Sequence, residues 1–138
     1  MSPRDTSTGD VLERMIVPAL DRGGYTSSKQ VVVGKRPGGR KHKVDAVAEK
    51  DGKKWLVSMK WQQTSGTAEQ KVPFEVISLA EAVREGGYAG AYLVLGGEGW
   101  TLRDFYTGNG LKKHLVDSDK VKIVTLEGFV AKANRGEL

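Results

Sequence analysis

The chain has 138 residues, close to the usual length of about 150 for one domain, so we expect a single domain spanning residues 1–138. Hydrophobic residues make up 38% and charged residues 28%, with a formal net charge of +5, which is an ordinary globular composition and excludes wholesale disorder. The absence of cysteine excludes disulfides, thiol nucleophiles and cysteine-held zinc. The two histidines are far apart, so any metal would be held by carboxylates, which favours Mg²⁺ or Mn²⁺.

The N-terminal sequence MSPRDTSTGD has no apolar core, and no stretch of the chain has 18 consecutive apolar residues. We therefore expect neither a signal peptide nor a membrane span, and a cytoplasmic location.

A first helix is predicted from a cap at Ser7 or Thr8 to about Asp21. Its apolar residues recur at helical spacing: Val11, Leu12, Met15, Ile16, Ala19 and Leu20. Gly23-Gly24 ends the helix. The β-branched run Val31–Val33 then predicts a strand.

The remaining elements alternate between strands and helices. Strands are predicted at 42–50, 53–61, GAYLVLGG and VKIVTL, helices at 66–85 and 127–134, and a mixed helical or loop stretch at WTLRDFYTGNGLKKHL. This order predicts an α/β fold with a mixed central sheet flanked by helices on both faces.

Asp51-Gly52, between two strand-like runs, is a strong hairpin signal. A two-residue turn there would place Asp45 opposite Ser58. Because side chains alternate faces along a strand, Asp45, Ser58 and Lys60 share one face, and Lys60 lies diagonal to Asp45 at about 7–8 Å.

A carboxylate, a hydroxyl and an amine at one end of a hairpin suit phosphodiester hydrolysis. A carboxylate-held Mg²⁺ neutralises charge on phosphate oxygens and activates water, and a nearby lysine orients the water or stabilises charge. The alternative is an ordinary cross-strand salt bridge at a strand end.

The stretch VDAVAEKDGKKWLVSMKWQ, preceded by a helix bearing a Glu and a strand, resembles the PD-(D/E)xK nuclease superfamily, which includes many restriction endonucleases and Holliday-junction resolvases. The resemblance covers roughly residues 8–96. It implies a restriction-endonuclease-like core of order αβββαβ, with Asp45 as the family aspartate and Ser58-Met59-Lys60 at the acidic-x-Lys tripeptide.

Ser58 stands where the family usually has Glu or Asp, and three explanations compete. The carboxylate has migrated to the following helix, as in restriction enzymes with a Ser-x-Lys strand, which would make it Glu69 or Glu75. Alternatively, Glu13 on the first helix completes the site. In the third explanation, catalysis is lost and the fold only binds DNA or a partner. We rank migration first.

In the catalytic interpretation, Asp45 binds the metal, and Glu69 or Glu75, with Glu13 as a further possibility, supplies the second carboxylate. Lys60 positions or activates water, and Ser58 is a supporting hydrogen-bonding group.

Basic and amide side chains around this site are candidate DNA contacts, because cations neutralise phosphates and amides bind bases or phosphates. They are Lys35, Arg36, Arg40, Lys41, Lys43, Gln62, Gln63 and Lys71. The alternatives are a solvated hairpin tip for the cations from 35 to 43, loop or cap hydrogen bonds for the glutamines, and an exposed helix lysine for Lys71.

These observations predict a Mg²⁺- or Mn²⁺-dependent endodeoxyribonuclease acting on double-stranded DNA, and the resemblance implies 5′-phosphate and 3′-hydroxyl products. A two-fold homodimer would match the two strands of a duplex. A Holliday-junction or structure-specific resolvase and a catalytically inactive DNA-binding module of the same fold are the alternatives.

Overall fold

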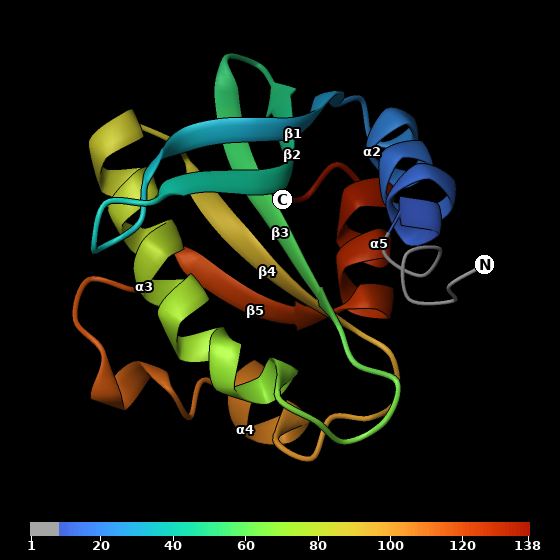
Figure 1. Cartoon of the computed structure of the whole chain (residues 1–138). Helices are drawn as coiled ribbons and strands as arrows, with labels where there is room; N and C mark the ends of the chain where they lie inside the picture. The colour runs from blue at the N-terminus through green and yellow to red at the C-terminus, as the bar shows by residue number, and fades with distance from the viewer. Residues whose placement is uncertain (1–8) are drawn as a thin grey trace.

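The computed structural model describes residues 9–138 and arranges them around one five-stranded sheet (Figure 1). The strands are β1 (Thr26–Lys35), β2 (Lys41–Lys50), β3 (Lys53–Trp61), β4 (Gly90–Gly96) and β5 (Val121–Thr125). The helical segments are η1 (Leu12–Ile16), α2 (Val17–Arg22), α3 (Ala68–Gly86), α4 (Arg103–Thr107), η2 (Lys112–His114) and α5 (Leu126–Asn134).

The sheet is mixed, with strand order β1-β2-β3-β4-β5. The first three strands are antiparallel neighbours, whereas β3, β4 and β5 run parallel. Parallel neighbours need a crossover connection, and α3 provides the one between β3 and β4. The predicted α/β class and element order are confirmed.

The hairpin between β2 and β3 has the predicted register. Ala46 pairs with Val57, and Glu49 pairs with Lys54. The turn residues Asp51 and Gly52 both have positive φ angles, 54° and 77°, as a type I′ turn requires. The local Asp-Gly signal was therefore sufficient to align these two strands.

Each face of the sheet has its own apolar core. On one face, α3 packs its apolar stripe over the central strands with Val72, Val76, Leu79 and Val83 against Val47, Leu56, Leu93 and Ile123. On the other face, η1, α2 and α5 cover the sheet with Leu12, Ile16, Leu20 and Phe129 against Ala46, Val57, Tyr92 and Val94. Figure 1 shows α3 on one side of the sheet and α2 beside α5 on the other.

Two elements differ from their predicted form. The first helix contains a π-helical turn at Leu12–Ile16 before α2, and its predicted cap at Ser7 or Thr8 lies outside the described residues. The strand predicted from Val31–Val33 extends over all of β1, because pairing with β2 brings in flanking residues of low β propensity. Within residues 9–138, no helix is long and apolar enough to cross a membrane.

Candidate active site

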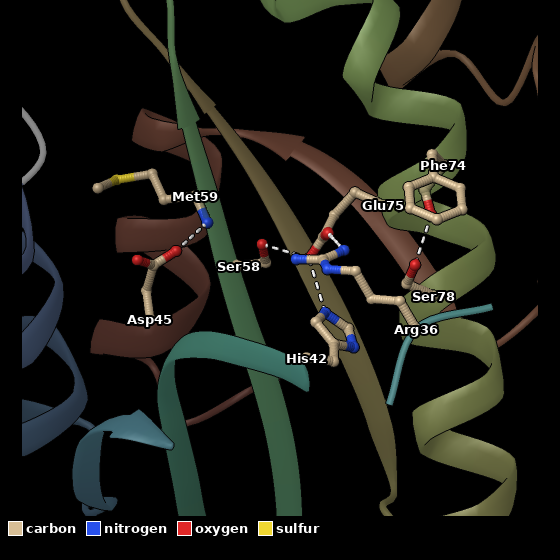
Figure 2. Close-up of polar contacts among 8 residues, drawn as sticks. All are labelled: Arg36, His42, Asp45, Ser58, Met59, Phe74, Glu75 and Ser78. Carbon is tan, nitrogen blue, oxygen red and sulfur yellow. Dashed lines mark hydrogen bonds and ion pairs between the residues drawn. The ribbon is translucent and has the colours of Figure 1, made fainter. Parts of the chain in front are cut away.

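The pairing of β2 with β3 stops at Ala46, so Asp45, the residue before it in the chain, is left unpaired with β3. Ala46 and Val57 form the last pair of that ladder. Beyond it, the Asp45 carboxylate takes over as acceptor, and its Oδ2 lies 2.7 Å from the Met59 backbone nitrogen (Figure 2). Asp45 is therefore held in the gap that opens between two separating strands.

The alternation of β2 breaks at the same place. Val44 and Val47 both belong to the core under α3, although three positions along a regular strand would put them on opposite faces. Ala46 lies in the opposite core. Opposite Asp45 on β1, Gln30 has a left-handed φ of 54°.

This break corrects the predicted face of Asp45. In Figure 2, Asp45 and Met59 lie on one side of β3, whereas Ser58 lies on the other. The expected direct pairing of Asp45 with Ser58 is absent from the ladder. The physical reason is the local break in alternation at Asp45, which lies opposite the left-handed Gln30 without a shift in the β1–β2 register.

The side chain of Glu75, on α3, contacts Ser58 of β3. Its side chain is 2% exposed, and its Oε2 accepts hydrogen bonds from Ser58 Oγ at 2.7 Å and from His42 Nε2 at 3.1 Å. Its Oε1 is ion-paired with Arg36, whose side chain is 23% exposed. A carboxylate from the helix therefore lies against the serine that replaces the acidic residue on β3 (Figure 2).

These contacts keep Glu75 ionised. Burial raises the pKa of Glu75, but the hydrogen bonds from His42, Arg36 and Ser58, together with the charge of Lys60, lower it to about 2. A carboxyl group whose pKa is lowered this far is ionised at neutral pH, and an ionised carboxylate can only accept hydrogen bonds.

Asp45 has the opposite electrostatic balance. Burial raises the pKa of Asp45 most strongly, the Met59 N–H and the Lys60 charge lower it, and the charge of Glu75 raises it further. The net result is a raised pKa. Lys60 thus acts on both carboxylates, and the charge of Glu75 raises the pKa of Asp45, so the three groups form one electrostatic cluster.

Glu69, the other predicted helix carboxylate, does not join this cluster. Its Oε1 accepts from Thr101 Oγ1 at 2.7 Å and its Oε2 from the Leu102 backbone nitrogen at 2.5 Å. The Thr101 hydroxyl and the Leu102 N–H lower the pKa of Glu69, and neither Asp45 nor Lys60 contributes to that shift. Glu69 anchors the segment before α4.

Glu13 is an exposed residue of η1 and forms an ion pair with Lys29 of β1. No contact joins it to Asp45 or Glu75 in the described part of the chain. The structure therefore does not bring the helix-one carboxylate to the cluster.

The candidate DNA contacts fall into three groups. Those with exposed side chains are Lys35, Arg40, Lys41, Lys43, Gln63 and Lys71. Arg36 instead turns inward to Glu75. Gln62 is buried, donating to the Gly99 carbonyl at 2.8 Å and accepting from the Ala68 N–H at 3.0 Å, so it takes the loop and cap role that was its alternative interpretation.

His42 lies between two of these basic residues in the sequence, Lys41 and Lys43, but the structure buries it completely. A usable signal was present, because residues 42 and 44 of a strand share a face and Val44 faces the core. The contact with Glu75 was beyond the sequence, since it joins residues 33 positions apart.

Within residues 9–138, no three His, Cys, Asp or Glu side chains come together to hold a metal ion. Two carboxylates do lie within electrostatic reach of each other. This donor set fits a hard cation such as Mg²⁺, which is commonly bound by one or two carboxylates and otherwise by water and substrate phosphates.

Comparison with known proteins identifies the family. A model described as PD-(D/E)XK nuclease superfamily domain matches residues 4–137, nearly the whole chain. The chain belongs to this superfamily, and its mixed sheet with flanking helices is consistent with that fold. Membership suggests a nuclease function and nucleic-acid binding, and nucleases of this superfamily generally use divalent metals.

A similar solved structure is the crystal structure of AF1548, a protein of unknown function. The two share 16% sequence identity with a TM-score of 0.52, and the match covers 80% of this chain and 54% of the other. The likeness concerns the fold alone, and this chain spans about half the length of that protein. No curated protein matches the chain.

Proposed function

We propose that the protein is a Mg²⁺- or Mn²⁺-dependent endodeoxyribonuclease acting on double-stranded DNA, with the whole chain forming one nuclease domain. One observation carries the proposal. Glu75 lies 2.7 Å from Ser58, its charge acts on Asp45 and the charge of Lys60 acts on both, which supports a helix carboxylate in place of the acidic residue that β3 lacks. This supports migration of the carboxylate and favours Glu75 over Glu69.

The chain's own groups then have distinct roles. Asp45 and Glu75 would hold the divalent cation, which when bound supplies charge neutralisation on phosphate oxygens and a more acidic water. The charge of Lys60 lowers the pKa of both carboxylates, and its ammonium group would hydrogen-bond the attacking water or the phosphate. Ser58 orients Glu75 through its hydroxyl.

The exposed cations near β2 supply the electrostatic part of DNA binding. Arg40 lies in the loop 36–40, whose first residue, Arg36, contacts Glu75, and Lys35, Lys41 and Lys43 lie on the strands that flank this loop. Cations in this position would neutralise phosphates on either side of the one that is cleaved. We propose a two-fold homodimer as the cutting form, because each chain offers one cluster and a duplex has two strands.

The ion pair between Arg36 and Glu75 favours a second candidate function. A guanidinium on Oε1 already neutralises the carboxylate that a metal would need. In that case the fold is a DNA-binding module without catalysis. The two functions differ in whether Glu75 exchanges Arg36 for a cation.

Cleavage assays distinguish these functions. Supercoiled plasmid, linear duplex and a four-way junction are each incubated with Mg²⁺, with Mn²⁺ and with EDTA, using wild type, Lys60→Ala and, as a control, Glu13→Gln. We expect metal-dependent cutting of plasmid and duplex that Lys60→Ala loses and Glu13→Gln keeps. Cutting confined to the junction indicates a resolvase. Salt-sensitive DNA binding without cutting in either metal contradicts the nuclease proposal and supports the binding module.

A further inference from the structure

His42 is a buried polar side chain with only one of its two ring nitrogens in use. It is 0% exposed, and its Nε2 lies 3.1 Å from Glu75 Oε2. Its Nδ1 is buried and has no hydrogen-bond partner within residues 9–138. Leaving a buried polar atom unpaired is destabilising, so an apolar residue here would serve packing alone better.

The direction of the contact follows from the charge of Glu75. An ionised carboxylate is only an acceptor, so the proton between the two groups belongs to His42 Nε2, which donates. Ser58 donates to the same oxygen at 2.7 Å. Oε2 therefore has two hydrogen-bond donors, His42 from β2 and Ser58 from β3. Oε1 is ion-paired with the partly exposed Arg36.

Glu75 needs such support because it reaches the site from a helix. Its carboxylate lies at the end of three rotatable bonds, so the position of α3 alone does not fix where the two oxygens point. Donors fixed in the sheet can hold one oxygen and so determine where the other one points.

We infer that His42 is a positioning residue that, with Ser58, holds Oε2 of Glu75 against the sheet and so presents Oε1 to a divalent cation. This inference rests on the proposed function, since it assigns Glu75 as a metal ligand. His42 does not itself touch the cation or the phosphate in this arrangement.

The test is the affinity of the full-length protein for Mn²⁺ alone, measured without DNA by calorimetry and by the electron paramagnetic resonance of free Mn²⁺. Loss of a group that orients a metal ligand typically weakens metal binding by about 10–100-fold, and we expect a loss of this size in His42→Ala. His42→Gln keeps an amide N–H near the position of Nε2, so it should recover most of the affinity.

Val44→Ala is the matched control, because Val44 is the next residue of β2 that faces the same core and its apolar side chain cannot hydrogen-bond Glu75. Val44→Ala should lower Tm and leave Mn²⁺ affinity unchanged. If His42→Ala binds Mn²⁺ as tightly as wild type, or if both alanine variants lose affinity equally, the positioning role is wrong while the metal site stands. If wild type binds no Mn²⁺ with or without DNA, the proposed function and this inference both fail.

Discussion

Two glutamates on α3, six positions apart, show how one helix can use the same side chain for two purposes. Glu69 lies at the beginning of α3, where a hydroxyl and a backbone N–H of residues 101–102 bind its two oxygens. Glu75 lies two turns further on and is bound by side chains of the β1–β2 loop, β2 and β3.

The difference lies in the charge of the partners. Glu69 has neutral donors from one short segment, which is typical of a carboxylate that fixes a loop. Glu75 is surrounded by Arg36, His42 and the charge of Lys60, and it influences Asp45 in turn. A carboxylate that interacts with several ionisable groups at the end of two strands is the better candidate for chemistry.

The largest expected effect is a difference in DNA cleavage between variants of the two glutamates. If Glu75 is the metal ligand that we propose, Glu75→Gln should reduce plasmid cleavage by more than the ~10–100-fold that loss of a supporting contact causes. Glu69→Gln should lower Tm and leave the cleavage rate of the folded enzyme close to that of wild type. Equal rates for the two variants would remove the distinction.

The next effect is on stability at acid pH. The pKa of Glu75 is lowered from 4.5 to about 2 in the folded protein, so its contribution to the free energy of unfolding is fully present above about pH 4.5 and is lost as the pH falls through about 2. At about 1.4 kcal/mol per unit, the contribution is on the order of 3 kcal/mol.

Urea unfolding between pH 5 and pH 2.5 checks this value. Wild type should lose more stability over that range than Glu75→Gln, which has no charge to lose at this position. Parallel curves for the two proteins would mean that Arg36 and His42 do not stabilise the ionised form of Glu75.

A third prediction concerns Ser58→Glu, which places an acidic side chain on β3. Ser58 is 3% exposed and its Oγ is 2.7 Å from Glu75, so Ser58→Glu alone should be destabilising through repulsion of two buried carboxylates. Combined with Glu75→Gln, the same change should recover cleavage by about tenfold over Glu75→Gln alone, or about 1.4 kcal/mol of barrier. A double variant no more active than Glu75→Gln would count against migration of the carboxylate.

The smallest effect on stability concerns Asp45, whose pKa is raised mainly by burial. A carboxyl with a raised pKa in the folded state favours folding only at low pH, and this contribution disappears as the pH rises through the folded-state pKa. Asp45→Asn keeps an acceptor for the Met59 N–H and removes the buried charge, so at pH 7 it should slightly raise the midpoint of urea unfolding while abolishing cleavage. A lowered midpoint would contradict this balance.

Local signals in the sequence were sufficient for the architecture. The Asp51-Gly52 turn aligned β2 with β3. The order of apolar strand-like runs and helix-like segments along the chain predicted the remaining strands and α3. Sequence could not choose between Glu69 and Glu75, because the choice depends on which distant segment faces each turn of α3. The partners of Glu69 lie 32 and 33 positions away.

The face of Asp45 was also beyond the sequence. The sequence of β2 predicts a regular strand. The residue opposite Asp45 on β1 is Gln30, which has a left-handed φ that glutamine does not itself indicate. His42 had an interpretable pattern, since it alternates with Val44, but its hydrogen bond to Glu75 depends on the packing of α3 over β2.

The hydrogen bond from the Met59 N–H to Asp45 has a further consequence for observing this protein in solution. A main-chain proton of a central strand is protected by a side chain instead of a neighbouring strand, at 2.7 Å. Any event that draws the Asp45 carboxylate away leaves that amide without its acceptor. Its nitrogen-15 resonance and its rate of deuterium uptake should therefore report occupancy of the cluster directly, without any label attached to the protein's surface.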